Sequence, residues 1–139
     1  MRCKVCGETD PTNFHRRLDG YQAKCKKCNS LAVCLYEHRK RFNFDVTLEE
    51  LLFLFDNTKR CLYCGRIMEK GIGKNHDLSP TLDIIDPFKN RITAKDVHFI
   101  CHQCNRTKSN RSHNEFVDFC QRVVKSFCTS TSSSSKNYI

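Results

Sequence analysis

Cys-x-x-Cys pairs constrain the fold of this 139-residue chain more than any other feature, because they account for eight of its 11 cysteines. Two such pairs, brought together, supply the four thiolates of a tetrahedral structural zinc site. We therefore predict two structural Zn²⁺ ions, one bound by the first two pairs and one by the last two. The predicted ligands, in chain order, are Cys3, Cys6, Cys25, Cys28, Cys61, Cys64, Cys101 and Cys104.

A secreted scaffold held by disulfides is the alternative interpretation of so many cysteines. The chain opens Met-Arg-Cys-Lys with no apolar signal run, and its number of cysteines is odd. Closely spaced doublets also suit a metal better than bridges between distant strands. We therefore expect an intracellular protein of a reducing compartment, cytoplasm or nucleus, and not a secreted one. No stretch approaches the ~20 apolar residues of a membrane span, so we expect no membrane association.

The charge of the chain favours a polyanionic partner. Its formal charge is +9, and eight thiolates with two zinc ions would leave it near +5. Nucleic acid is the simplest partner for such a balance, although a solvated basic surface would give the same charge.

The first part of the chain, residues 1–44, is predicted to be a zinc knuckle followed by a basic helix. The knuckle is too small to bury much apolar surface, so the metal must supply most of its folding free energy. Phe14 and Tyr21 can form a minimal core. Helix-forming composition over 29–41 places Cys34 on the apolar face of a helix, which indicates a packing role and not metal binding.

The second part, residues 45–128, is predicted to contain a strand–strand–helix (ββα) unit. Thr47-Leu-Glu-Glu50 is a capping box, and it predicts a helix over about 47–57 that packs between the two zinc units. Strands are expected at about 81–85 and 97–100, with a helix from Cys104 to Asn110. The fold class that follows is a small α+β, zinc-stabilised protein.

A long amphipathic helix is predicted near the C-terminus, after a second capping box at Ser112-x-x-Glu115. Its apolar positions recur at helical spacing, which explains Cys120 by packing; Cys128 lies at its end. Residues 129–139 are Ser-rich and are predicted to be a disordered tail. The apolar positions are Phe116, Phe119, Cys120, Val123, Val124 and Phe127.

Asp83 at the end of the first predicted strand and Asn105 at the start of the helix suggest a second kind of metal site. Metal-dependent nucleases use a ββα unit with these residue types to hold one divalent ion at the scissile phosphate. Hard cations such as Mg²⁺ prefer the carboxylate and amide oxygens that these two side chains offer.

Three segments together resemble the HNH (His-Me finger, ββα-metal) endonucleases. The first knuckle is similar to the leading module of recombination-endonuclease-VII-like phage nucleases, and the whole order resembles the small dimeric two-zinc HNH restriction enzymes. The resemblance implies a ββα-metal unit on a four-cysteine zinc ribbon, with Asp83 and Asn105 holding catalytic Mg²⁺ or Mn²⁺. The segments are Cys61-x-Tyr63-Cys64-Gly65, Leu82-Asp83-x-Ile85-Asp86-Pro87 and Cys101-x-x-Cys104-Asn105-x-x-Lys108.

The chain departs from the family pattern at the general base. The family usually has a His after the strand-end acid, and here that position is Ile84, which accepts no proton. Asp96 matches the central Asn position of the family. His76, in the loop before the strand, is our first choice for the base, followed by His38 and Tyr63. His98 and His102 are further candidates, each with a structural alternative.

The function that these residues predict is a metal-dependent DNA endonuclease acting on duplex or branched DNA. A homodimer is expected, because one ββα site cuts one strand. Two alternatives stay open, a non-catalytic zinc-dependent nucleic-acid-binding protein on a degenerate HNH scaffold and a zinc-stabilised protein-interaction module. The predicted phosphate contacts are Arg106, Lys108 and Arg111 beside the site and Arg39, Lys40 and Arg41 on the first helix.

Overall fold

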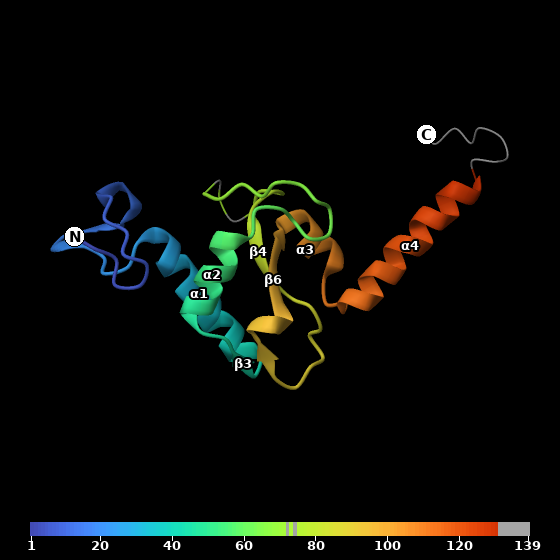
Figure 1. Cartoon of the computed structure of the whole chain (residues 1–139), viewed down its shortest axis with the longest axis horizontal. Coiled ribbons are helices and arrows are strands. Elements are labelled where there is room, and N and C mark those ends of the chain that lie inside the picture. Colours follow the sequence, from blue (N-terminus) through green and yellow to red (C-terminus); the bar gives the residue numbers. More distant parts are fainter. Residues whose placement is uncertain (72, 74, 131–139) are drawn as a thin grey trace.

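The computed structural model describes residues 1–71, 73 and 75–130. Figure 1 shows three regions in a row: an N-terminal zinc unit, a central body of short helices and strands, and a long C-terminal helix. The predicted small α+β fold is confirmed. No helix in these described ranges is both long and apolar enough to cross a membrane.

The N-terminal unit contains little regular structure. A single 3-10 turn, η1 (Pro11–Asn13), precedes a minimal hairpin of β1 (Arg16–Arg17) and β2 (Gly20–Tyr21). Phe14 is buried against the cysteines as predicted. Tyr21, however, is 44% exposed, so its predicted place in the core is wrong. Its strand lies at the edge of the unit, which has only four buried residues and so offers little apolar surface for Tyr21 to pack against.

Two helices connect this unit to the body. α1 (Lys26–Arg41) begins earlier than predicted, directly after Cys25, and buries Leu31 and Leu35. Cys34 is partly buried against the same core, as expected. The chain then forms β3 (Phe44–Asp45), which pairs in parallel with β5 (Ile92–Thr93) and so attaches the end of α1 to the body.

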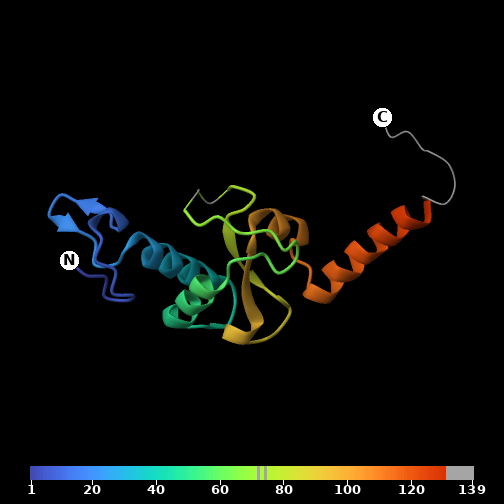
Figure 2. The same ribbon diagram turned by 45° about the horizontal axis from the view of Figure 1, so that its top comes forward.

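α2 (Leu48–Asn57) forms as the sequence predicts. Its capping box is present: Thr47 Oγ1 accepts from the Glu50 backbone N–H at 3.2 Å, and Glu50 Oε2 accepts from the Thr47 N–H at 2.8 Å. Leu51 is fully buried in the central core, and Leu52 touches the cores of both zinc units. The predicted place of this helix between the units is therefore confirmed, as Figure 2 also shows.

The ββα unit lies at the centre of the body (Figures 1 and 2). β4 (Pro80–Ile84) pairs antiparallel with β6 (Val97–Cys101), and this register sets Asp83 opposite His98. A short 3-10 turn, η2 (Ala94–Asp96), precedes β6. α3 (His102–Lys108) follows directly and packs on both strands.

α4 (His113–Ser130) projects from the body as a separate rod in both views. The predicted capping box is present at its start, where Glu115 Oε2 accepts from the Ser112 N–H at 2.8 Å. The helix continues two residues beyond the predicted boundary at residue 128 and ends at Ser130. The rest of the predicted tail, residues 131–139, lies outside the described residues.

Candidate functional site

The eight paired cysteines form two clusters, each with four thiols whose sulfur atoms lie within 4.8 Å of one another. The Cys6 and Cys25 sulfurs are 3.6 Å apart, and the Cys64 and Cys101 sulfurs are 3.7 Å apart. These distances are too long for a disulfide. They match the ~3.8 Å edge of a tetrahedron with Zn–S bonds of about 2.3 Å. The predicted grouping of the cysteines is confirmed, and each cluster could hold a zinc ion.

Hydrogen bonds favour the thiolate form of one cysteine of the second cluster, Cys64. Burial acts to raise the pKa of the Cys64 thiol, but hydrogen bonds from the side chain and backbone of Arg66 outweigh it and lower this pKa to about 6. The Arg66 Nε donates to the Cys64 sulfur at 3.4 Å. A thiolate is therefore favoured at neutral pH, and this is the form that binds zinc.

Asp83 is buried in the middle of the β4–β6 pair, with 5% of its surface exposed. Its Oδ2 accepts from His98 Nε2 at 2.7 Å, and its Oδ1 accepts from Lys108 Nζ at 3.0 Å. Lys108 is 1% exposed and also donates to the Ile84 carbonyl at 2.8 Å. A buried ammonium with these partners is poorly placed to reach a phosphate. Its predicted nucleic-acid contact gains no support from this position.

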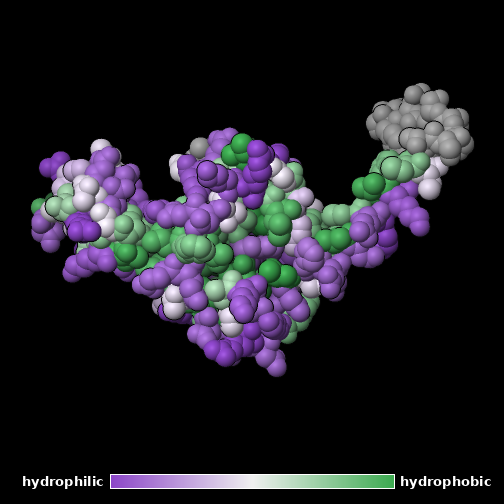
Figure 3. Space-filling model, viewed as in Figure 1, coloured by the Kyte–Doolittle hydropathy of each residue, from purple (hydrophilic) through white to green (hydrophobic). Residues whose placement is uncertain are grey.

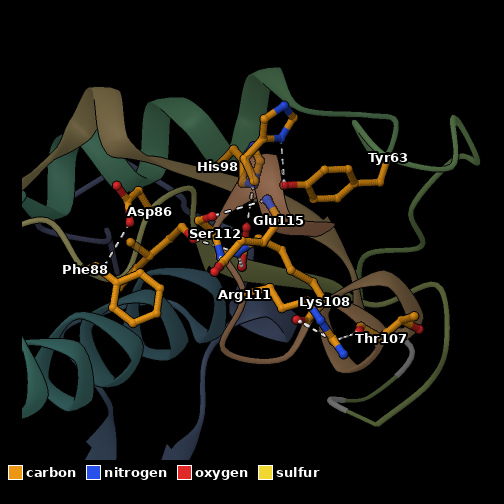
Figure 4. Close-up of polar contacts among 12 residues, drawn as sticks. Tyr63, Asp86, Phe88, His98, Thr107, Lys108, Arg111, Ser112 and Glu115 are labelled. Carbon is orange, nitrogen blue, oxygen red and sulfur yellow. Dashed lines mark hydrogen bonds and ion pairs between the residues drawn. The ribbon is translucent and has the colours of Figure 1, made fainter. Parts of the chain in front are cut away.

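A layer of rings adjoins this ion pair (Figure 4). The Tyr63 hydroxyl and His113 Nδ1 are 3.1 Å apart, and the two rings stack at 5.7 Å. The Tyr63 ring meets His98 edge-on at 5.6 Å. Burial, with the negative charge of Asp83 as the next cause, raises the pKa of the Tyr63 phenol. Tyr63 therefore keeps its proton at neutral pH.

A cleft of about 210 Å³ opens between α1 and the ββα unit. Asp83 and Asn105, the two predicted metal ligands, both line it, together with His38 and Arg41 of α1. Asn105 lies in α3 directly after a zinc-cluster cysteine, which fixes its position relative to β4. Within the described part of the chain, the Asn105 side chain makes no hydrogen bond, so its amide oxygen can accept a ligand.

His38 is oriented by its own helix. Its Nδ1 lies 2.8 Å from the Cys34 carbonyl oxygen, which can only accept, so Nδ1 carries the proton. Nε2 is then the unprotonated nitrogen of the neutral ring. Phe42 stacks on the ring at 6.4 Å and Phe44 lies tilted against it at 5.2 Å. These contacts hold a proton acceptor beside the cleft.

The remaining candidate bases lie elsewhere. His76 is exposed in the loop before β4, where its Nδ1 accepts from the Leu78 N–H at 3.2 Å, and it does not line the cleft. Asp96, the match to the central family Asn, instead caps η2: it accepts from the Thr93 N–H at 2.8 Å and pairs with Lys89. Asp86 forms a turn by accepting from the Phe88 N–H at 3.0 Å.

The other predicted phosphate contacts lie on the surface of α1 and around α3. Arg106 pairs with Asp77 at 3.0 Å, with both side chains more than half exposed. Arg111 donates to the Thr107 carbonyl at 3.1 Å. On α1, Arg39 donates to the Val46 carbonyl at 2.8 Å and Lys40 pairs with Glu37 at 3.1 Å, while Arg41 is exposed at the cleft.

Sequence reasoning missed three partners in this region: the bond from Lys108 to Asp83, the bond between His98 and Asp83, and the Tyr63–His113 pair. One signal was available for His98. Asp83 is the one charged residue of the first strand and His98 the one polar residue of the second, and the antiparallel pairing sets them opposite each other. The position of His113, 50 residues from its Tyr63 partner in sequence, has no comparable local signal.

Comparison with known proteins supports the fold. No protein-family model matches the chain, and neither does any curated protein sequence. Among solved structures, the chain is similar to the rare-cutting HNH restriction endonuclease PacI, which was described for its perturbation of DNA. The match has a TM-score of 0.53 and 21% identity, and it covers 90% of this chain and 94% of that chain. The chain therefore has the fold of an HNH nuclease with two four-cysteine clusters.

Proposed function

We propose that this protein is a metal-dependent DNA endonuclease of the HNH type, which hydrolyses phosphodiester bonds. The observation that carries the proposal is that Asp83, Asn105 and His38 line one cleft. Asp83 comes from β4, Asn105 from α3 and His38 from α1, so these side chains lie close together only in the folded chain. Two oxygen ligands and a base are the groups that such a hydrolysis needs.

The oxygen donors suit a hard divalent cation such as Mg²⁺ or Mn²⁺. Each Asp83 oxygen already accepts one hydrogen bond, from His98 or Lys108, and retains a second lone pair. The Asn105 amide oxygen would complete the pair of protein ligands. When bound, the ion would neutralise charge on the scissile phosphate and its leaving oxygen.

His38 is the group that we expect to accept the proton of the attacking water. Its Nδ1–H is held by the Cys34 carbonyl, which leaves Nε2 as the acceptor. This role changes our first choice from His76 to His38, because His38 alone of the two lines the cleft. His98 and Lys108 do not touch the substrate in this scheme; they position the Asp83 carboxylate.

DNA is the substrate that the surface charge favours. Arg41 stands at the cleft and Arg106 and Arg111 lie around α3, where they can contact the phosphates on either side of the cut. We expect binding to weaken steeply and log-linearly with salt. Replacing Arg41 and Arg106 with Ala should make that dependence less steep, whereas an unchanged slope would place the binding surface elsewhere.

The test is cleavage of plasmid and of branched DNA by the zinc-loaded protein with Mg²⁺ or Mn²⁺. Asp83→Ala and Asn105→Ala should abolish cleavage while DNA binding persists. His38→Gln should lower the rate by ~10²–10⁴-fold, the usual contribution of positioned proton transfer. His76→Gln is the matched control and should leave the rate unchanged.

Three other outcomes would change the assignment. A silent His38→Gln together with an inactive Tyr63→Phe would move the base to Tyr63. A loss of rate in His76→Gln would restore the loop histidine as the base. Tight DNA binding with no cleavage under any divalent metal would favour the alternative, a nucleic-acid-binding protein on an HNH scaffold.

A further inference from the structure

The turn that follows β4 presents an aromatic ring to solvent next to the cleft. Phe88 is 71% exposed, more than any other phenylalanine of the described chain. It directly follows Pro87, which lines the cleft together with Asp83 and Asn105. The residue that carries this ring is therefore bonded to the wall of the site proposed to hold the scissile phosphate.

Polar contacts on both sides hold this turn in place. The Asp86 carboxylate accepts from the Phe88 N–H at 3.0 Å, and the Asp86 carbonyl accepts from the Lys89 N–H at 3.3 Å (Figure 4). Ion pairs made by Lys89 and Arg91 attach the end of the turn to η2 and β3. A ring held on such a turn is preorganised, so contact with a ligand costs little conformational entropy.

The surroundings of the ring favour nucleic acid over a protein partner. Residues 86 and 89–91 are polar and exposed, and Figure 3 shows mainly hydrophilic residues over the lower part of the body, where this turn lies in Figure 1. Protein partners bind contiguous apolar patches, which one ring does not form. A nucleobase, in contrast, offers a π-face to a single ring, and Arg41 at the cleft can contact the adjoining backbone.

A ring in this position reaches a base only by entering the base stack. The outside of a duplex consists of sugar and phosphate, and the faces of its bases are covered by their neighbours. Phe and Pro are among the side chains that separate stacked base steps in DNA–protein complexes. We propose that Pro87-Phe88 is a wedge that inserts between the bases next to the cut, an inference that rests on the proposed DNA substrate.

The wedge defines a class of substrate. Separating two stacked bases costs free energy, and that cost is least where a base is mismatched or already unpaired. The protein therefore prefers DNA whose stacking is weakened at the step beside the scissile phosphate. Phe88 acts here as a specificity-determining residue, because it contacts the base and takes no part in the hydrolysis.

Tryptophan fluorescence tests the insertion directly, because the chain contains no tryptophan. In the full zinc-loaded Phe88→Trp variant, without added Mg²⁺ or Mn²⁺, duplex DNA should strongly quench the emission, since stacking on a base quenches an indole. Phe53→Trp is the matched control: Phe53 is 69% exposed on α2 and does not line the cleft, so its emission should persist. DNA that binds by anisotropy but leaves position 88 unquenched, or quenches both positions equally, would overturn the inference.

Affinity for mismatched DNA tests the predicted preference. The wild type should bind a duplex with one mismatch about tenfold more tightly than the matched duplex. Phe88→Ala should lose this preference and bind the mismatched duplex ~10–100-fold more weakly, with unchanged zinc content. Phe53→Ala should keep both the preference and the affinity. A Phe88→Ala variant that retains the preference would refute the wedge.

These binding measurements separate the wedge from the nuclease proposal. Quenching in Phe88→Trp without cleavage under any divalent metal would support the wedge and contradict the nuclease. Cleavage by the wild type without quenching in Phe88→Trp would do the opposite. A protein that binds no DNA would overturn both.

Discussion

The two four-cysteine clusters have the same composition but lie in very different surroundings. In the N-terminal unit the buried apolar residues are Cys3, Phe14, Cys25 and Cys28, so three of the four belong to the cysteine cluster itself. In the second unit, Cys61 and Cys101 belong to a core of 14 buried residues that draws on α1, α2 and the ββα strands. The first cluster supplies most of the buried residues of its unit, whereas the second supplies only a few residues of a much larger core.

This difference separates two roles for the same metal chemistry. A unit with one buried aromatic residue cannot fold on apolar burial alone, so we expect a bound zinc ion to supply most of its folding free energy. In the central body, the second cluster positions the backbone that carries Asn105 of the candidate site. Cys101 ends β6, and its sulfur accepts from the Cys104 N–H at 3.4 Å at the start of α3. Asn105 follows directly and is thereby aimed at the cleft.

The largest expected effect comes from removing one ligand of the first cluster. Cys28→Ser should abolish its zinc binding, worth about 10–16 kcal/mol in small zinc units, and unfold residues 1–25. Hydrogen exchange should show full loss of protection there and retained protection in β4 and β6. Cys34→Ser, on the same helix but outside the cluster, should change neither. Loss of protection in both units would contradict the prediction that only the N-terminal unit depends on the first cluster for folding.

The second-largest effect is expected from breaking the buried ion pair in the central body. Lys108→Met should leave the Asp83 charge buried without its ammonium and lower the free energy of unfolding of the body by about 3 kcal/mol. Arg106→Met on the same helix removes an exposed pair and should cost under about 1 kcal/mol. Urea denaturation followed by tyrosine fluorescence measures both. Equal losses would mean that the buried pair contributes no more than a surface one.

The smallest expected effect comes from removing one side-chain cap in each of the two units. Hydrogen bonds from Lys89 and Thr93 lower the pKa of Asp96 to about 2. Because the folded pKa is depressed, its contribution is complete above about pH 4 and fades only as the pH falls toward 2. At pH 7, Asp96→Ala should therefore cost the body about 1 kcal/mol.

Asp10 is the matched position in the N-terminal unit, where its side chain caps η1 by accepting from the Thr12 N–H at 2.9 Å. Asp10→Ala should leave the melting temperature of the body unchanged. A shift equal to that of Asp96→Ala would show that the two units unfold together.

Much of this molecule could be predicted from local sequence. The spacing of the cysteine pairs predicts two clusters, because cysteines separated by two residues can turn toward one ion. The Thr47 and Ser112 capping boxes predict where α2 and α4 begin, since both partners of each box lie within four residues. The types and positions of Asp83 and Asn105 also make them candidate ligands before any fold is known.

Tertiary structure decided what surrounds those candidates. Lys108 and Arg106 are both basic residues of one predicted helix, yet the turn of α3 buries one against Asp83 and leaves the other in solvent. His38 and His76 are equally plausible bases by type, and only the packing of α1 across the ββα unit brings His38 to the cleft. Local patterns act through neighbours along the chain, whereas a side chain's partners depend on contacts between distant segments, which form only when the core packs.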